Sequence, residues 1–349
     1  MTGVNIDARW GLRATLVPQL FTLTRRQAAT SGIIFGQDPR WSPSEGKSGG
    51  NRWHTQHERP LTHMVHCYAE GLVNQAVAGQ ARGLMPMGGC YVAVWGLLGH
   101  HAAQLADGAD EYGRWAAVMI SGLGPSSKGV VVVSCYRAPG VDTIRNDGGI
   151  VARMQRQMSL PNPDAVHKRF YADLGHQLDR WSALGHEIIL QGDVNATIRR
   201  GVETKDRPAD LQMTEWAERQ GLELLEFEEG RKACTFEVNR GKTKAPARRQ
   251  LDVILVSSGL AKMLKAEALV KTCELSGVAQ GHRALSWFSA TALTDWLGLR
   301  QKAPAWTKEQ QRVAEAESLR VADSRLLIQA GSEAEEAYVE ALGDARALR

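Results

Sequence analysis

The sequence has few cysteines and no long apolar run. Its cysteines are scattered along the chain without a Cys-x-x-Cys pair: Cys67, Cys90, Cys135, Cys234 and Cys273. Such a set excludes a disulfide framework and a zinc ribbon and predicts a reducing compartment. The most apolar stretch, residues 90–98, is far shorter than the roughly 20 residues that cross a bilayer. With no cleavable signal pattern at its start, we expect an intracellular protein, nuclear or cytoplasmic, that is not secreted and has no membrane partner.

A strong excess of charge is also missing. Lys and Arg together number 42 and Asp and Glu 38, so the net charge is +4 and the pI is about 8.8. This mild excess permits nucleic-acid binding without requiring it. Hydrophobic residues make up 43% of the 349 positions, which suffices for one large α/β domain or two smaller ones.

Short apolar runs, most of them rich in β-branched residues, alternate with helical segments. The runs predict buried strands at 33–35, 91–95, 116–120, 130–136, 188–190 and 251–256. Helical periodicity predicts helices at 12–28, 163–183 and 211–220. This alternation predicts an α/β fold, a layered sheet with helices outside. Segment 42–59, rich in Ser, Gly, Pro and charge, predicts a long surface loop.

The composition shifts after residue 288. Residues 306–349 are dominated by Ala, Glu, Arg and Leu and contain no strand-like run, which predicts helix. We therefore expect one α/β domain over residues 1–294 and a helical tail or linker over 295–349.

The most informative motif is Gly192-Asp193-Val194-Asn195, which follows an apolar run. Side chains two apart on a strand point the same way, so Asp193 and Asn195 are expected to face together. A carboxylate can take a proton from water, and a carboxamide can donate hydrogen bonds to an anionic oxygen. The same tetrapeptide is also ordinary turn chemistry after a strand, and both interpretations stay open on this motif alone.

Three more polar residues stand near the ends of expected strands. Asn5 and Asp7 follow a short extended piece, and Asp38 follows the run 33–35. Mg²⁺ is held by one or two carboxylates together with phosphate oxygens and water, so these residues are candidate ligands. A helix N-cap at Asn5 or Asp7 and a turn acid before Pro39 are the plain alternatives.

A phenol, a carboxylate and an imidazole complete the candidate set. Tyr136 ends the strand 130–136 and can donate to a phosphate oxygen, although a tyrosine there is more often plain packing. Asp252 stands at the entrance of an apolar strand, where a buried acid needs a partner. His282 is the candidate partner, because an imidazole held by a carboxylate can stabilise negative charge on a phosphorane.

Taken in order, these motifs resemble the endonuclease/exonuclease/phosphatase superfamily over about residues 4–290. The resemblance is carried by Asn5-x-Asp7, Gln37-Asp38, Gly113-Arg114-Trp115, Tyr136 with Pro139, Gly192-Asp193-Val194-Asn195, Thr235-Phe236, Leu251-Asp252 and Gly281-His282-Arg283. The Gly-Arg-Trp element and the charge-rich helical tail look most like endonuclease domains of non-LTR retrotransposons.

The resemblance implies a two-layered β-sandwich flanked by helices and a metal-dependent phosphodiesterase site. Asp193 would orient or deprotonate the attacking water, and Asn195 would hold the water or the phosphate. Tyr136 and His282 would contact the scissile phosphate, and Asp252 would orient His282. Asn5, Asp7 and Asp38 would surround Mg²⁺ or Mn²⁺.

Two positions depart from the family pattern, both on the cation side of the site. The family usually has Glu where this chain has Asp38, and its Ser-Asp-His reads Gln280-Gly281-His282 here. We expect weakened metal binding with an intact phosphate pocket. A catalytically inactive binding domain, or a phosphatase of the same superfamily, remains the alternative to a DNA endonuclease.

Basic residues flank the expected site. Arg199 and Arg200 follow the Gly-Asp-x-Asn loop, and Arg248 and Arg249 precede the strand of Asp252. Such loops would neutralise the phosphates of a DNA duplex without reading its sequence. Solvated surface charge is the plain alternative for the second pair.

The missing carboxylate before His282 gives a gain-of-function prediction. Restoring it with Gly281→Asp should raise metal-dependent nicking of a supercoiled plasmid, because an added acid beside Asp7 and Asp38 would strengthen cation binding. The nicking rate is to be measured over a Mg²⁺ titration beside Gly281→Asn, which adds similar bulk without charge. Equal rates in the parent and Gly281→Asp would show that this carboxylate does not limit the reaction.

Overall fold

A computed structural model describes residues 2–5, 31–37, 65–69, 88–122, 128–139, 149–198, 208–228, 234–238, 247–264, 270–273, 284–287 and 292–299. All of them belong to one compact unit, Met1–Leu299. The helix expected at 12–28, the loop expected at 42–59 and residues 300–349 lie outside the described residues. Core packing continues to Leu297 and Leu299, and the domain boundary expected at residue 295 stays a prediction.

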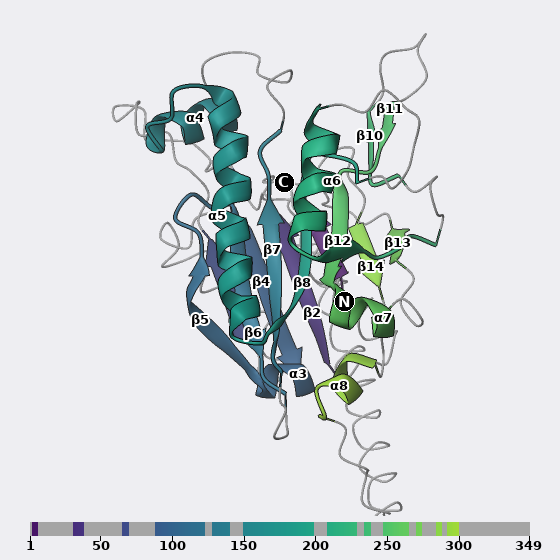
Figure 1. Cartoon of the computed structure of the whole chain (residues 1–349). Helices are drawn as coiled ribbons and strands as arrows, with labels where there is room; N and C mark the ends of the chain where they lie inside the picture. Colours follow the sequence, from purple (N-terminus) through teal and green to yellow (C-terminus); the bar gives the residue numbers. More distant parts are fainter. Residues whose placement is uncertain are drawn as a thin grey trace, which may run out of the picture. The chain divides into compact units, whose positions relative to one another are not determined.

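Two six-stranded sheets form the framework (Figure 1). The first has the order β13-β14-β1-β2-β4-β3. Its strands are β13 (Val270–Cys273), β14 (Ala284–Trp287), β1 (Thr2–Asn5), β2 (Ser31–Gln37), β4 (Cys90–Gly96) and β3 (Val65–Ala69). In this sheet β1 and β2 pair in parallel, and the other described pairs are antiparallel.

The second sheet has the order β5-β6-β7-β8-β12-β9. Its strands are β5 (Ala102–Ala109), β6 (Trp115–Ile120), β7 (Val130–Tyr136), β8 (Glu187–Asp193), β12 (Asp252–Ser257) and β9 (Leu222–Leu224). Here β7 and β8 form the parallel pair. A separate hairpin joins β10 (Phe236–Val238) to β11 (Ala247–Arg249).

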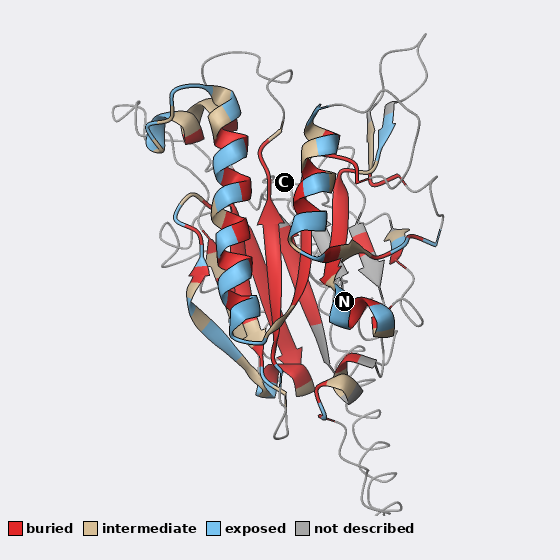
Figure 2. Cartoon of the chain, in the orientation of Figure 1, coloured by how far each residue is buried: buried red, intermediate tan, exposed pale blue. Residues whose placement is uncertain are grey.

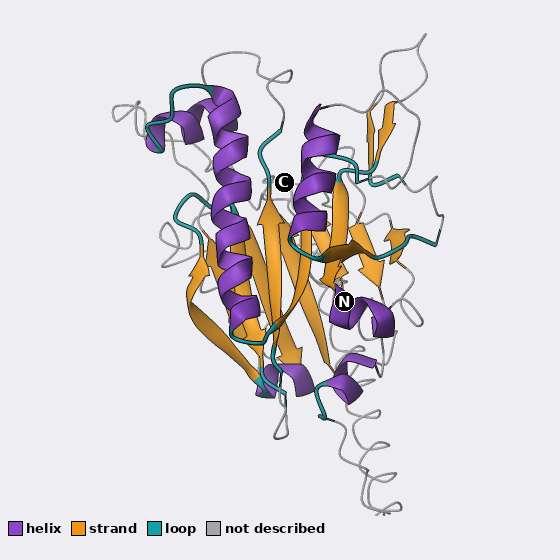
Figure 3. Ribbon diagram, in the orientation of Figure 1, coloured by secondary structure: helices purple, strands orange, loops and turns teal. Residues whose placement is uncertain are grey.

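The main core lies between the two sheets. Phe35 and Val92 of the first sheet pack in one buried cluster with Val132, Ile189 and Ile254 of the second. Alternate residues of the second sheet point the other way, into a second cluster beneath the long helices. The expected α/β fold, a two-layered β-sandwich flanked by helices, is confirmed (Figure 3).

Two helices cover the outer face of the second sheet, with their buried sides inward and their exposed sides outward (Figure 2). They are α5 (Pro163–Ala183) and α6 (Pro208–Arg219). The shorter helices are α3 (Leu97–His100), α4 (Ile150–Gln157), α7 (Ser258–Leu264) and α8 (Ala292–Trp296). Nowhere in the described part of the chain is a helix long and apolar enough to cross a membrane.

Local signals explain which elements the sequence predicts. The six expected strands appear as β2, β4, β6, β7, β8 and β12. Helix α5 spans the predicted range because the Asn162 side chain caps it, accepting the Ala165 N–H at 2.9 Å, and Pro163 opens its first turn. Strand β5 was not expected, because its Ala, Gly and Gln residues have low strand propensity and only pairing with β6 makes it a strand.

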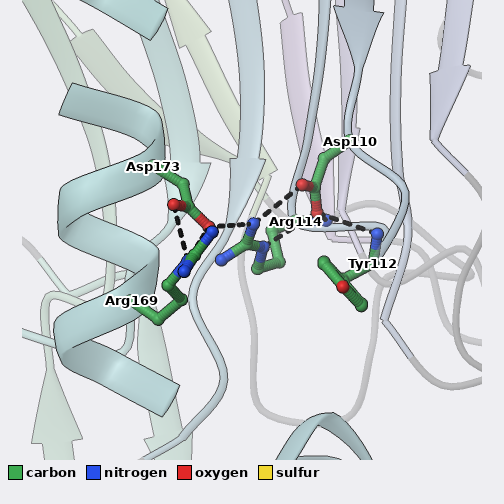
Figure 4. Close-up of polar contacts among 5 residues, drawn as sticks. All are labelled: Asp110, Tyr112, Arg114, Arg169 and Asp173. Carbon is green, nitrogen blue, oxygen red and sulfur yellow. Dashed lines mark hydrogen bonds and ion pairs between the residues drawn. The ribbon is translucent and has the colours of Figure 1, made fainter. Parts of the chain in front are cut away.

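A buried arginine closes the turn between β5 and β6 (Figure 4). Arg114 donates to Asp110 through Nε and through Nη2, each at 2.8 Å, and its Nη2 also donates to Asp173 of α5 at 2.8 Å. Arg169, one turn before Asp173, pairs with the same acid from a largely exposed position. Burial alone would lower the pKa of the Arg114 guanidinium, but Asp110 and then Asp173 raise it above its ordinary value. The predicted Gly-Arg-Trp element is therefore an anchor between the sheet and α5.

Helix α5 also buries a histidine. Both ring nitrogens of His167 lack a hydrogen-bond partner among the described residues. Burial, and then the charge of Arg137, lower the pKa of His167 from 6.5 to about 3. The imidazole is therefore neutral in the folded chain over the whole physiological range.

Arg114 should contribute far more to stability than Arg169. Arg114→Met leaves the buried Asp110 carboxylate uncompensated, which should lower the free energy of unfolding by about 3–5 kcal/mol. Arg169→Met removes a mostly exposed pair with the same Asp173 and should cost less than about 1 kcal/mol. Urea denaturation of both variants measures the difference, and equal losses would contradict the anchoring role of Arg114.

His167 should make the fold sensitive to mild acid. Its pKa is lower in the folded than in the unfolded chain, so the unfolded state binds more protons and stability falls as pH drops from 6.5 toward 3. This one group should remove about 2 kcal/mol between pH 7.5 and pH 5. His167→Leu should abolish that part of the pH dependence, measured by urea denaturation at both pH values. His176→Leu, at an exposed position on the same helix, is the control for loss of a histidine. A slope in His167→Leu equal to that of the parent would refute the assignment.

Candidate active site

Three predicted site residues form one row across the second sheet. In the parallel pair β7–β8 Tyr136 lies opposite Asp193, and in the antiparallel pair β8–β12 Asp193 lies opposite Asp252. Laterally paired residues of neighbouring strands project from the same face. Ile189 and Ile254, on the same face of β8 and β12, belong to the core between the sheets. The row therefore lies at the rim of the sandwich interior, where β7 and β8 end and β12 begins.

The row is buried and contains two acids. Tyr136 is 7% exposed, Asp193 2% and Asp252 5%. Two carboxylates on neighbouring strands repel each other, so this arrangement requires compensating hydrogen bonds or positive charge.

The position of Asn195 corrects the expectation drawn from two-residue spacing. Strand β8 ends at Asp193, and Asn195 has a positive φ of 49°, so the chain is not extended between them. Instead, the Asn195 backbone N–H donates to Asp193 Oδ1 at 3.1 Å, and Asn195 Nδ2 donates to the Arg137 carbonyl at 2.8 Å. The motif is thus a tight turn, a conformation that asparagine tolerates better than most residues. The turn holds the Asn195 amide between the ends of β7 and β8.

A threonine fixes the start of β12. Thr235 is fully buried, and its Oγ1 accepts the backbone N–H groups of Leu251 at 2.8 Å and Asp252 at 3.0 Å. The Leu251 carbonyl in turn accepts the Val194 N–H at 2.9 Å. Strand pairing and the Val194–Leu251 hydrogen bond therefore join the backbones that carry Asp193 and Asp252, and Thr235 holds the Asp252 backbone from the other side.

The loop after Asn195 is held by two further contacts. Asp210, in the first turn of α6, accepts the Thr197 N–H at 2.7 Å. Thr197 Oγ1 donates to the Gln250 carbonyl at 3.1 Å. Strand ends that would otherwise be mobile are therefore tied to the framework.

One hydrogen bond joins the two sheets beside the row. Ser134 of β7 donates through Oγ to the carbonyl of Gly36 in β2 at 2.9 Å. Gly36 precedes Gln37, which lies opposite Asn5 in the parallel pair β1–β2. The backbone ends of β1 and β2 are therefore held near the end of β7. For Asn5, the structure describes the backbone position alone.

The basic hairpin lies close in sequence and space to Asp252. Arg248 and Arg249 are exposed on β11, and the Arg249 carbonyl accepts the N–H of Thr235. Arg248 Nε lies 3.2 Å from Glu237 Oε2 on β10. These two of the four predicted phosphate-binding arginines are therefore on the surface, and Arg248 already lies beside an acid.

The other predicted residues lie outside the described residues: Asp7, Asp38, Arg199, Arg200 and His282. Sequence reasoning assigned no role to Arg137, Asp210 or Ser134, which contact the site backbone. Two sequence signals were available: Asp210 stands in the first turn of α6, and Ser134 is a polar residue inside the Val-rich strand β7. Cys135, next to Asp193, stays a neutral thiol because burial, and then the charge of Asp193, raise its pKa.

No group of three or more Asp, Glu, His or Cys side chains in the described part of the chain converges on a metal position. The donor chemistry nevertheless suits a hard cation. Two buried carboxylates, Asp193 and Asp252, lie side by side at the rim, and carboxylate oxygens are ligands that Mg²⁺ prefers. A divalent cation would offset the repulsion between such acids.

Solved structures share this architecture. The chain is similar to the catalytic domain of Xenopus laevis APE2, with a TM-score of 0.51 and 16% sequence identity. The match covers 83% of the present chain and 92% of the APE2 domain. An AP endonuclease from Archaeoglobus fulgidus matches with a TM-score of 0.50 and 12% identity, over 82% and 97% of the two chains. The endonuclease domain of TRAS1, a telomere-specific non-LTR retrotransposon, matches with a TM-score of 0.44 and 14% sequence identity. That match covers 82% of the present chain and 95% of the TRAS1 domain.

No protein-family model and no curated protein sequence matches the chain. At these identities the structural likeness concerns the fold alone. The two sheets, packed face to face and flanked by helices, agree with the sandwich fold that the sequence motifs predict. The chain therefore has the endonuclease/exonuclease/phosphatase fold.

Proposed function

We propose that the protein is a metal-dependent DNA endonuclease of the non-LTR retrotransposon type, a hydrolase of phosphodiester bonds. The row of Tyr136, Asp193 and Asp252 at the ends of β7, β8 and β12 carries the proposal. The two solved structures with the higher TM-scores, named as the catalytic domain of APE2 and an AP endonuclease, support a nuclease function at the level of the fold. The retrotransposon type rests on the Gly113-Arg114-Trp115 element and the charge-rich tail.

In the proposed reaction Asp193 takes the proton of the attacking water. Its carboxylate is oriented by the Asn195 N–H, and the Asn195 amide is held by the Arg137 carbonyl. Asn195 therefore stands where it can orient the water or a phosphate oxygen. The Tyr136 hydroxyl donates a hydrogen bond to a phosphate oxygen and keeps its proton, while Asp252 holds His282 in one tautomer.

The proposed cation ligands are Asn5, Asp7 and Asp38, at or just after the ends of β1 and β2. The Ser134–Gly36 hydrogen bond supports their convergence on the row, because it fixes the backbone just before Gln37 beside β7. When bound, Mg²⁺ or Mn²⁺ neutralises charge on the phosphate and on the leaving oxygen. Asp38 is one methylene shorter than the usual Glu, and we expect the affinity for the cation to be reduced.

DNA is the proposed partner, bound through its phosphate backbone. Arg248 and Arg249 project from the hairpin whose base holds Asp252, and Arg199 and Arg200 follow the loop of Asn195. A phosphate at Arg248 competes with Glu237, which makes this contact sensitive to salt.

A catalytically inactive nucleic-acid-binding domain is the second candidate. Gly281 favours it, since the family pattern has a carboxylate there. The row in the second sheet is compatible with both candidates, so the metal-dependent reaction decides between them.

The endonuclease proposal predicts Mg²⁺-dependent nicking of a supercoiled plasmid that depends on Asp193. Asp193→Asn should lower the nicking rate by about 10²–10⁴-fold, because the isosteric amide cannot accept the proton of the water. Asp107→Asn is the matched control: Asp107 lies on the same sheet and pairs with Arg180 at 2.9 Å, outside the row. It should nick at the parental rate.

Two outcomes contradict the proposal. Nicking by Asp193→Asn at the rate of Asp107→Asn would remove Asp193 from the mechanism. Salt-dependent duplex binding by the parent without nicking in either Mg²⁺ or Mn²⁺ would favour the inactive domain.

A further inference from the structure

Arg137 follows Tyr136 and points to the opposite side of the second sheet. Tyr136 belongs to the core between the sheets, whereas the Arg137 guanidinium carbon lies 5.5 Å from the centroid of the Tyr171 ring of α5. Arg137 is only 1% exposed. Its charge is therefore buried behind the sheet, on the side away from the row.

Arg137 contacts each of the three residues of the Asp193 turn. Its backbone N–H donates to the Asp193 carbonyl at 2.9 Å, and its own carbonyl accepts Asn195 Nδ2 at 2.8 Å. Its Nη1 donates to the Val194 carbonyl at 3.3 Å. The first two contacts need only the backbone of residue 137. The third depends on the arginine side chain.

The surroundings of the guanidinium keep it in place. The face of the Tyr171 ring attracts the cation, and burial raises the pKa of the Tyr171 phenol to about 12, so the ring stays neutral. His167 is neutral as well, because burial and Arg137 lower its pKa to about 3. Within this pocket the Arg137 guanidinium therefore lies against the Tyr171 ring and donates to the Val194 carbonyl, two contacts that fix its position.

We infer that Arg137 is a positioning residue for the proposed nuclease: from behind the sheet, its guanidinium holds the Val194 carbonyl and thereby the turn that aims Asp193 and Asn195. The inference rests on the proposed function. Asn195 adopts a positive φ of 49°, which an extended strand end would not maintain. Because the residues on both sides of Val194 act on the water and the phosphate, a small rotation of this peptide would displace both side chains.

Loss of the guanidinium should therefore slow chemistry without weakening binding. Arg137→Met should lower kcat for plasmid nicking about 100-fold, the usual effect of a displacement of about 1 Å in a catalytic group. KM for the duplex and the Mg²⁺ concentration for half-maximal rate should stay within about twofold, since Arg137 lies behind the sheet. Arg137→Lys keeps a donor and should recover part of kcat; it also replaces Arg137→Met if that variant does not fold.

Arg114→Met is the control for loss of a buried arginine. It should lower the melting temperature but retain kcat at a temperature where circular dichroism shows every variant folded. An unchanged kcat in Arg137→Met, or equal falls of kcat in the Arg137 and Arg114 variants, would overturn the positioning role.

Amide hydrogen exchange separates this inference from the proposed function. In Arg137→Met or Arg137→Lys, exchange over residues 194–197 should speed up at least 10-fold, while exchange over 253–256 of β12 should not change. If the parent does not nick DNA, the endonuclease proposal fails, and unchanged exchange over 194–197 would then also reject the positioning role.

Discussion

The register of β8 between β7 and β12 is the constraint on which the site depends. Glycine at position 192 is required for it, because a Cβ there would overlap the carbonyl oxygen and Sγ of Cys135 on β7. The close approach of the two backbones fixes Tyr136 beside Asp193, and the antiparallel pairing with β12 fixes Asp252 on the other side. A slip of one residue would turn Asp193 toward the helices. The row therefore exists only in this register.

The second sheet uses its two faces differently. Its inner face ends in the polar row, whereas its outer face buries the arginine anchors: Arg114 is held by Asp110 and Asp173, and Arg137 lies against Tyr171. Arg114 directly precedes β6 and Arg137 directly follows β7, at neighbouring strand ends. The Arg114 carbonyl accepts the N–H of Tyr136, the residue before Arg137, at 2.8 Å. Charged groups on the outer face of the second sheet thus support the end of β7, which carries Tyr136 on its inner face. Exchanging Arg137 for an apolar residue would keep the layers but loosen the Asp193 turn, because the Arg137 side chain is the one that reaches Val194.

Much of this framework follows from local sequence signals. The Val-rich run of β7 and the capped α5 were predictable, because β-branched runs and an Asn-Pro start act locally. Tyr136, Asp193 and Asp252 were predictable as polar residues at strand ends, and the lateral register then places them together. The turn at Asn195 was one of two interpretations left open by the motif, because residue spacing does not reveal where a strand stops. Arg137 carried no signal: its partners, Val194 and Tyr171, are brought near it only by the fold.

The candidate residues divide between the two sheets, and this division bears on the altered positions. Tyr136, Asp193 and Asp252 belong to the second sheet, where backbone pairing and Thr235 fix them. Strands β1, β2 and β14 belong to the first sheet; Asn5 ends β1, and in the sequence Asp38 follows β2 and Gly281 precedes β14. Among the described side chains, Ser134 links the sheets beside the site through its bond to Gly36. Substitutions in the first sheet can therefore change how a cation is held without disturbing the register of the row. Altered residues at the proposed cation site, such as Asp38 and Gly281, are therefore compatible with an intact arrangement of Asp193 and Asp252.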